Sequence, residues 1–124
     1  MAILETPLMR GLERVLDQAA FRHQVLTTNL ANVDTPNYRA RDIRSFAGEI
    51  EQAMANDGSA EATPMGPVSY EMRGLNERPD GNNVSVERET LLVAQNQLRF
   101  QVAIAFLKDE FHRLTLAING GSTS

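Results

Sequence analysis

The stretch VERETLLVAQNQLRFQVAIAFLKDEFHRLTLAI, residues Val86 to Ile118, decides the fold because it contains neither proline nor glycine. Such a run favours one uninterrupted helix, which would be roughly 50 Å long at 1.5 Å per residue. Ser85 is a good N-cap before it, and Glu87 and Glu89 lie where the helix dipole favours acids. The glycine pair at 120–121 is expected to end the helix.

Two apolar stripes run along this predicted helix. The first stripe consists of Leu91, Ala94, Leu98, Val102 and Ala105. The second stripe consists of Phe100, Ala103, Ile104, Leu107, Phe111, Leu114 and Ile118. A helix that is apolar on more than one side requires more than one neighbour to cover it.

A second amphipathic helix is predicted from about Thr6 to Ala31. Its apolar residues recur at spacings of three and four, and they are Leu8, Leu12, Val15, Leu16, Ala19, Leu26 and Leu30. Thr6 is a suitable N-cap, and the proline after it suits the first helical turn. The helix should end within residues 32–36, because Pro36 disfavours the helical conformation of the residue before it.

The middle of the chain, residues 37–83, is more polar and less periodic than the two ends. Its expected parts in chain order are a charged link at 39–44, a short helix marked by Phe46, Ile50 and Met54, a loop at 56–67, a short strand at 68–73, and a turn at 79–83. Within that turn, Asp80 and Gly81 are suited to a tight hairpin.

These elements predict a mainly α fold in which long N- and C-terminal helices form an antiparallel coiled coil. The middle segment would be mostly irregular, with one short helix and a small β-hairpin as an open alternative. We divide the single domain into 1–36, 37–83 and 84–124. Two paired helices bury only one stripe each, so copies or relatives of the chain should cover the rest. The isolated chain should be partly disordered, especially at its ends.

Composition excludes several classes of protein. The 124 residues are 42% hydrophobic and 23% charged, which fits one folded domain. No stretch reaches the ~20 apolar residues of a membrane span, and the beginning lacks the pattern of a cleaved secretory signal. The absence of cysteine removes disulfides and thiolate chemistry, and the net charge of −4 argues against nucleic-acid binding.

No pattern in the sequence indicates catalysis. His23 and His112 could form a metal pair, but two ligands are too few for a structural zinc site, so interfacial polar contacts are favoured. Residues 80–83 resemble a calcium loop only faintly. The arginines within 39–44 form either a solvated face with local ion pairs or an inter-subunit contact. We therefore expect no catalytic residue, metal, cofactor or small-molecule substrate.

The stretch NLANVDTPNYRA, residues 29–40, has one evident structural role, which is to end the first helix and redirect the chain. It also resembles the N-terminal signature of the bacterial flagellar axial proteins, the rod, hook and hook-associated family, whose usual form is close to A-N-x-x-T-P-G-Y. Asn37 stands where many relatives have glycine. The signature-turn residues identified on this resemblance are Asn29, Asn32, Asp34, Thr35, Pro36 and Tyr38.

This resemblance implies a structural subunit of the proximal rod of the flagellar basal body, exported through the type III apparatus without a cleaved signal. Such a subunit polymerises through its terminal helices into the drive shaft that transmits torque and houses the export channel. The implied partners are other copies of itself, neighbouring rod proteins such as FlgC, the adaptor FliE, the MS-ring protein and the flagellar export apparatus. The expected assembly interface consists of Leu12, Leu16, Leu26, Leu30, Leu98, Val102, Ile104, Leu107, Phe111 and Leu114.

One alternative from a different class stays open on the sequence. A small soluble helical adaptor or chaperone would use the same apolar stripes to hold a partner helix. It would be a compact and cooperatively melting monomer or dimer, whereas an assembly subunit would become fully ordered only among its neighbours.

Overall fold

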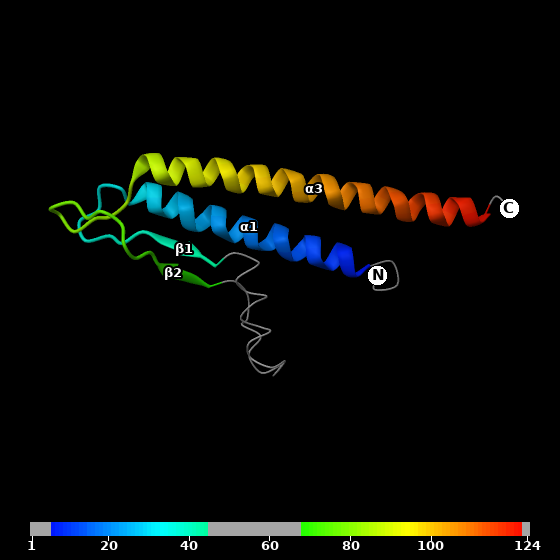
Figure 1. Ribbon diagram of the computed structural model, residues 1–124, viewed down its shortest axis with the longest axis horizontal. Coiled ribbons are helices and arrows are strands. Elements are labelled where there is room, and N and C mark those ends of the chain that lie inside the picture. Colours follow the sequence, from blue (N-terminus) through cyan, green and yellow to red (C-terminus); the bar gives the residue numbers. More distant parts are fainter. Residues whose placement is uncertain (1–5, 45–67, 123–124) are drawn as a thin grey trace, which may run out of the picture.

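The computed structural model describes residues 6–44 and 68–122 of the chain. Its elements in chain order are α1 (Pro7–Ala31), β1 (Arg41–Ile43), β2 (Ser69–Glu71) and α3 (Val86–Ser122). Figure 1 shows the two long helices side by side and antiparallel, with α1 between α3 and the small sheet. The mainly α prediction, with long helices at both ends of the chain, is confirmed.

The first helix begins and ends where the sequence predicts. The Thr6 side chain accepts a hydrogen bond from the backbone N–H of Met9 at 3.1 Å, and proline follows in the first turn. At the other end Asn32 is the C-cap, and its backbone N–H donates to the carbonyl of Thr28 at 3.1 Å. Both ends of α1 therefore satisfy backbone groups that a helix leaves without partners.

The second long helix begins as predicted but ends later. The Ser85 hydroxyl accepts from the backbone N–H of Arg88 at 3.2 Å, as expected of an N-cap. The prediction that the glycines at 120–121 end the helix is wrong, because α3 continues through them to Ser122. Among the described residues the only glycines with positive φ are Gly74 and Gly81. A helical glycine costs about 1 kcal/mol relative to alanine, which weakens a helix without forcing it to end.

The small sheet pairs two strands that are distant in sequence. β1 and β2 are antiparallel, with Arg41 opposite Glu71 and Ile43 opposite Ser69. The strand expected within 68–73 is confirmed, whereas the interpretation of 39–44 as a mere charged link is wrong because it contains β1. Within β1 the one arginine, Arg41, binds the hydroxyl and the backbone carbonyl of Ser69 in β2.

The turn at residues 79–83 does not connect these strands. The backbone N–H of Gly81 donates to the carbonyl of Arg78 at 2.9 Å, and the N–H of Arg78 donates to the carbonyl of Asn82 at 2.8 Å. The turn therefore lies inside the loop between β2 and α3, and the small hairpin that the sequence left open is not formed around Asp80 and Gly81. The short helix expected around 46–54 and the loop at 56–67 lie outside the described residues.

The core of the protomer is small, and much of it is polar. Among residues 6–44 and 68–122, the buried hydrophobic residues are Ala19, Leu26, Ala40, Val84 and Ala103, and the buried polar residues are Asn29, Asp42, Asn82, Asn83, Glu89 and Asn96. Small apolar residues and amides bury little apolar surface, so directed hydrogen bonds must specify much of the tertiary structure. No helix within the described residues is long and apolar enough to cross a membrane.

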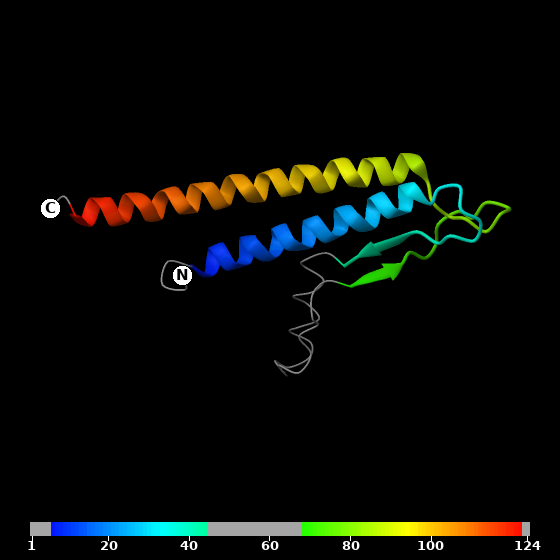
Figure 2. The same cartoon turned by 180° about the vertical axis from the view of Figure 1, so that it is seen from behind.

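The two helices are held most closely at the end where the chain turns. Figure 2 shows them diverging toward the end of the molecule that carries both termini. Thr6, just before α1, reaches Glu110 of α3 at 3.5 Å, and Figure 1 shows that α3 continues beyond the start of α1. Among the described elements, α1 is the one that α3 contacts most extensively.

Candidate functional site

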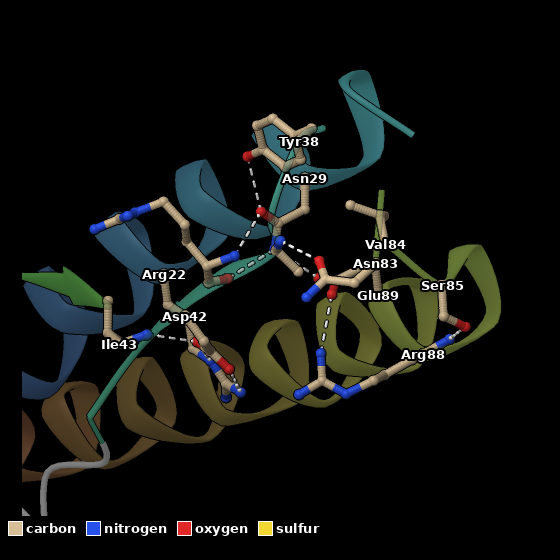
Figure 3. A network of polar contacts seen from close by, with 12 residues as sticks. Arg22, Asn29, Tyr38, Asp42, Ile43, Asn83, Val84, Ser85, Arg88 and Glu89 are labelled. Carbon is tan, nitrogen blue, oxygen red and sulfur yellow. Dashed lines mark hydrogen bonds and ion pairs between the residues drawn. The ribbon is translucent and has the colours of Figure 1, made fainter. Parts of the chain in front are cut away.

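The signature turn is built around one buried amide, that of Asn29 (Figure 3). Its Nδ2 donates to the backbone carbonyl of Arg41 at 2.7 Å and to Oε2 of Glu89 at 3.0 Å. Its Oδ1 accepts from the Tyr38 hydroxyl and from the backbone N–H of Arg41, each at 3.0 Å. All the hydrogen-bonding capacity of the amide is used. We call Asn29, Tyr38, Arg41 and Glu89 the Asn29 network; it joins α1, the turn, β1 and α3.

Glu89 brings a fully buried carboxylate into this network. Besides the bond from Asn29, its Oε1 is 3.0 Å from Nη1 of Arg88. It also lies in the first turn of α3, where the helix dipole favours negative charge. A buried charge is tolerated only when it is paired and hydrogen-bonded, and both conditions are met here.

The segment before α3 binds the end of α1 through a second amide. Nδ2 of Asn82 donates to the backbone carbonyls of Asn32 and Thr35 at 2.9 and 2.8 Å. Its Oδ1 accepts from the backbone N–H of Val84 at 2.7 Å. The guanidinium of Arg78 donates to the backbone carbonyls of residues 33 and 84. The start of α3 is thereby fixed against the end of α1.

The backbone at Asn37, in the signature turn, approaches the backbone at Asp80 and Gly81 closely. Asn37 has a φ of 64°, a left-handed conformation that favours glycine or asparagine. Its backbone N–H donates to the carbonyl of Asp80 at 2.9 Å. Gly81, with a φ of 84°, faces the Asn37 side chain, and a Cβ built on it would clash with Oδ1 of Asn37. The exchange of glycine for asparagine in the signature is therefore compatible with the turn.

The small sheet is attached to α1 by a bidentate ion pair. Nε and Nη2 of Arg22 bind Oδ1 and Oδ2 of Asp42, each at 2.9 Å. The side chains are 17% and 7% exposed, so both are mostly removed from water. The Asp42 carboxylate also accepts from the backbone N–H of Ile43 at 2.7 Å. This geometry fixes the position of β1 along α1.

Burial affects the acidity of Tyr38. Desolvation raises the pKa of its hydroxyl above the usual 10.0, the nearby Arg41 lowers it, and the negative charge of Glu89 raises it. The net result is a raised pKa, so the neutral hydroxyl that donates to Asn29 is favoured.

The basic cluster at 39–44 finds partners within the chain. Arg39 pairs with Glu71 at 3.1 Å and with Glu77 at 3.2 Å. Arg41 donates to the Ser69 hydroxyl at 2.9 Å, and the guanidinium of Arg44 lies 4.7 Å from the centre of the Tyr70 ring. Of the two interpretations, local pairing accounts for these contacts.

The expected interface and turn residues occupy three environments. Leu26 and Asn29 are buried inside the protomer. Leu12, Leu16, Leu30, Asn32, Tyr38, Ile104, Leu107 and Leu114 are half-buried. Asp34, Thr35, Pro36, Leu98, Val102 and Phe111 are exposed. Leu26 therefore packs within its own chain, and the exposed members of the set remain available to a neighbour.

Sequence reasoning missed both polar and apolar residues of this site. It treated Asn82 only as part of the turn at 79–83, and it treated Glu89 only as a favourable charge in the first turn of the helix. It also placed Phe106 in neither stripe, although this residue follows Val102 at a spacing of four and is 60% exposed. That spacing was the signal that could have identified it.

The two histidines do not meet. Both are exposed, and His112 lies in a groove of about 500 Å³ between the diverging ends of α1 and α3. The groove is lined by Met9, Glu13, Leu107, Lys108, Phe111, His112 and Thr115. Within residues 6–44 and 68–122, no group of three or more His, Cys, Asp or Glu side chains could hold a metal ion.

Comparison with known proteins gives a consistent set of relatives, although no protein-family model matches the chain. The chain is similar to proteins named flagellar basal body rod protein FlgB. The Bacillus subtilis protein is 29% identical over 129 residues, covering 91% of this chain and 94% of the relative. The Salmonella typhimurium protein is 30% identical over 131 residues, covering 92% and 94%. The Cereibacter sphaeroides protein is 34% identical over 108 residues, covering 80% and 84%.

Proposed function

The chain belongs to the FlgB family of flagellar basal body rod proteins, and from this membership we propose that it polymerises through its terminal helices into the proximal part of the rod. In this role it is a structural protein of the basal body. We propose further that this polymer transmits torque and encloses the export channel.

The observation that carries this proposal is the apolar surface that α3 leaves exposed. Its large apolar side chains with 46–62% of their surface exposed are Val86, Leu91, Leu98, Val102, Phe106, Phe111, Leu116 and Ile118. Extended apolar surfaces of this kind on a folded protein usually mark interfaces. Neighbouring subunits packed along α3 would remove this surface from water.

The same geometry suits a mechanical role. Long helices packed side by side between subunits interlock as knobs into holes, and many small dispersion contacts add up to a stiff tube. A head-to-tail contact that does not close on itself builds a helical assembly rather than a ring. The Asn29 network would keep the two helices of each subunit in a fixed register while torque passes between subunits.

The proposed neighbours follow from a position at the base of the rod. They are further copies of this chain, the rod protein FlgC, the adaptor FliE, the MS-ring protein and the export apparatus. Contacts with each of them would use the exposed faces of the terminal helices, because the Asn29 network is already satisfied within the protomer.

Imaging of basal bodies from a strain that lacks the gene tests this function. We expect rods to be absent, and the wild-type gene to restore them with the chain located by antibody at the base of the rod. Complete rods without the chain would contradict the proposal. A compact chain that forms a cooperatively melting dimer and is absent from basal bodies would instead support the adaptor alternative.

A further inference from the structure

A cationic cavity of about 270 Å³ lies where α1, the end of β1 and α3 meet. Arg22, Arg44 and Arg99 bring three guanidinium groups to it, and Gln18 and Gln95 add amides. None of the residues that line it is acidic. The carboxylate of Asp42 is already bound to Arg22, at 2.9 Å, so the cavity keeps an excess of positive charge in a chain whose net charge is −4.

Arg99 is the guanidinium available for a new partner. It is exposed, and its side chain has no ion pair or hydrogen bond within the described part of the chain. Arg22, by contrast, is committed to Asp42, and Arg44 lies over the ring of Tyr70. A guanidinium with free donors beside amide groups is suited to bind a carboxylate.

The wall of the cavity that belongs to α3 continues as an apolar row. Arg99, Val102 and Phe106 follow one another at spacings of three and four, so they lie along the same side of the helix. Val102 is 46% exposed and Phe106 is 60% exposed. A partner that fits this surface needs an acidic side chain followed by apolar side chains at helical spacing.

The start of α3 offers that pattern. Glu87, Leu91, Ala94 and Leu98 follow one another at spacings of four, three and four, and all four are exposed. The Glu87 side chain, like that of Arg99, has no hydrogen bond or ion pair among the described residues. In both rows the charged residue comes first and the apolar residues follow in the same chain direction.

We propose that the cavity binds the Glu87 carboxylate of a second copy of this chain, with the two α3 helices packed in parallel and displaced along their axes. Placing Glu87 of one copy at Arg99 of the other displaces the copies by twelve residues of sequence, or about 18 Å of helix. At this offset Leu91 of the first copy lies level with residue 103 of the second, next to Val102, and Ala94 lies level with Phe106. This contact rests on the proposed rod function and identifies one of its subunit interfaces.

The contact has two physical consequences. It joins the beginning of one α3 to the middle of another, so it repeats without closing and can extend an assembly. Burial of the flanking apolar rows would exclude water from both charges, so a wrong register that leaves either charge buried without its partner would be strongly penalised. The cavity would therefore set the axial offset between copies.

Charge exchange in a strain that carries only the altered gene tests the contact. Arg99→Glu and Glu87→Arg are each expected to abolish swimming, and the double variant that carries both is expected to regain it. The matched control combines Glu87→Arg with Arg10→Glu, which reverses an exposed arginine of α1 outside the cavity, and it should stay non-motile. Single variants that swim normally, or a double variant no better than either single one, would overturn the proposal.

Cross-linking in basal bodies provides a second readout that does not depend on motility. The chain contains no cysteine, so introduced thiols are the only ones present. Two co-expressed copies with different tags, one carrying Glu87→Cys and the other Arg99→Cys, should form a disulfide-linked dimer. Arg10→Cys combined with Arg99→Cys should not. A failure of both tests in a strain whose rods the wild-type gene restores would reject this contact and leave the rod function intact.

Discussion

At the scale of single residues, the protomer depends on the side-chain amides of Asn29 and Asn82, which form hydrogen bonds with backbone N–H and carbonyl groups of other segments. The sequence indicated a turn at 32–36 and several hydrogen-bonding side chains within it. It did not indicate that Asn29 would make four bonds to three other segments, because such contacts join residues up to 60 positions apart in the chain. Local patterns predict caps and turns, whereas pairing across the fold depends on tertiary structure.

The contact between Asn37 and Gly81 gives a prediction about stability. Gly81→Ala should lower the free energy of unfolding by about 1–2 kcal/mol for the left-handed backbone alone, and the clash with Asn37 Oδ1 adds to this. Urea unfolding of the purified variants measures the effect. In an Asn37→Gly background the same substitution should cost less, because the clashing side chain is gone. Equal costs in both backgrounds would show that the close approach is absent.

The raised pKa of Tyr38 gives a prediction about alkaline pH. Its neutral hydroxyl donates to Asn29, so its contribution to stability is complete below pH 10.0, the ordinary value, and is lost as pH rises through the higher pKa of the folded state. In a Tyr70→Phe variant Tyr38 is the only tyrosine, and its ultraviolet absorbance should titrate above 10. Urea should return the midpoint to about 10. An unchanged midpoint would argue against burial of the hydroxyl.

At the scale of elements, the helices were predictable and the strands were partly so. Periodicity and caps gave both ends of α1 and the start of α3. The end of α3 was wrong because glycine only weakens a helix. β1 was missed because a strand of three residues, Arg41 to Ile43, is too short to show an alternating pattern. The sequence did show that α3 has apolar residues on more than one side, and the structure leaves Leu91 and Leu98 exposed.

Because one face of α3 is exposed in the protomer, a substitution on this face should impair assembly without impairing folding. Phe106→Asp should leave the helix content and melting of the purified chain unchanged, because this side chain is 60% exposed in the protomer. The same substitution should abolish swimming, since a carboxylate would be buried in the subunit interface. Gln97→Asp, at an exposed polar position of the same helix, serves as the matched control and should swim normally. A motile Phe106→Asp strain would argue against burial of this face.

At the scale of the whole molecule, α1 and α3 are joined by many polar contacts at the end where the chain turns, and they diverge at the end that carries the termini. Hydrogen bonds and ion pairs gather where the chain turns between the helices, as Figure 3 shows. Toward the termini the helices diverge, and the last turns of α3 extend past the start of α1 (Figures 1 and 2). We therefore infer that the end at which the chain turns holds the protomer together, and we propose that neighbouring subunits complete the end that carries the termini.

Hydrogen exchange on the isolated chain in dilute solution tests this claim most directly. Amide exchange reports the free energy of local opening along the chain. We expect slow exchange around Asn29, β1 and the first turns of α3, and fast exchange in residues 107–122 of the same helix. Uniform protection of α3 up to residue 122 in a monomer would contradict the account, because the helix would then need no neighbour to complete it.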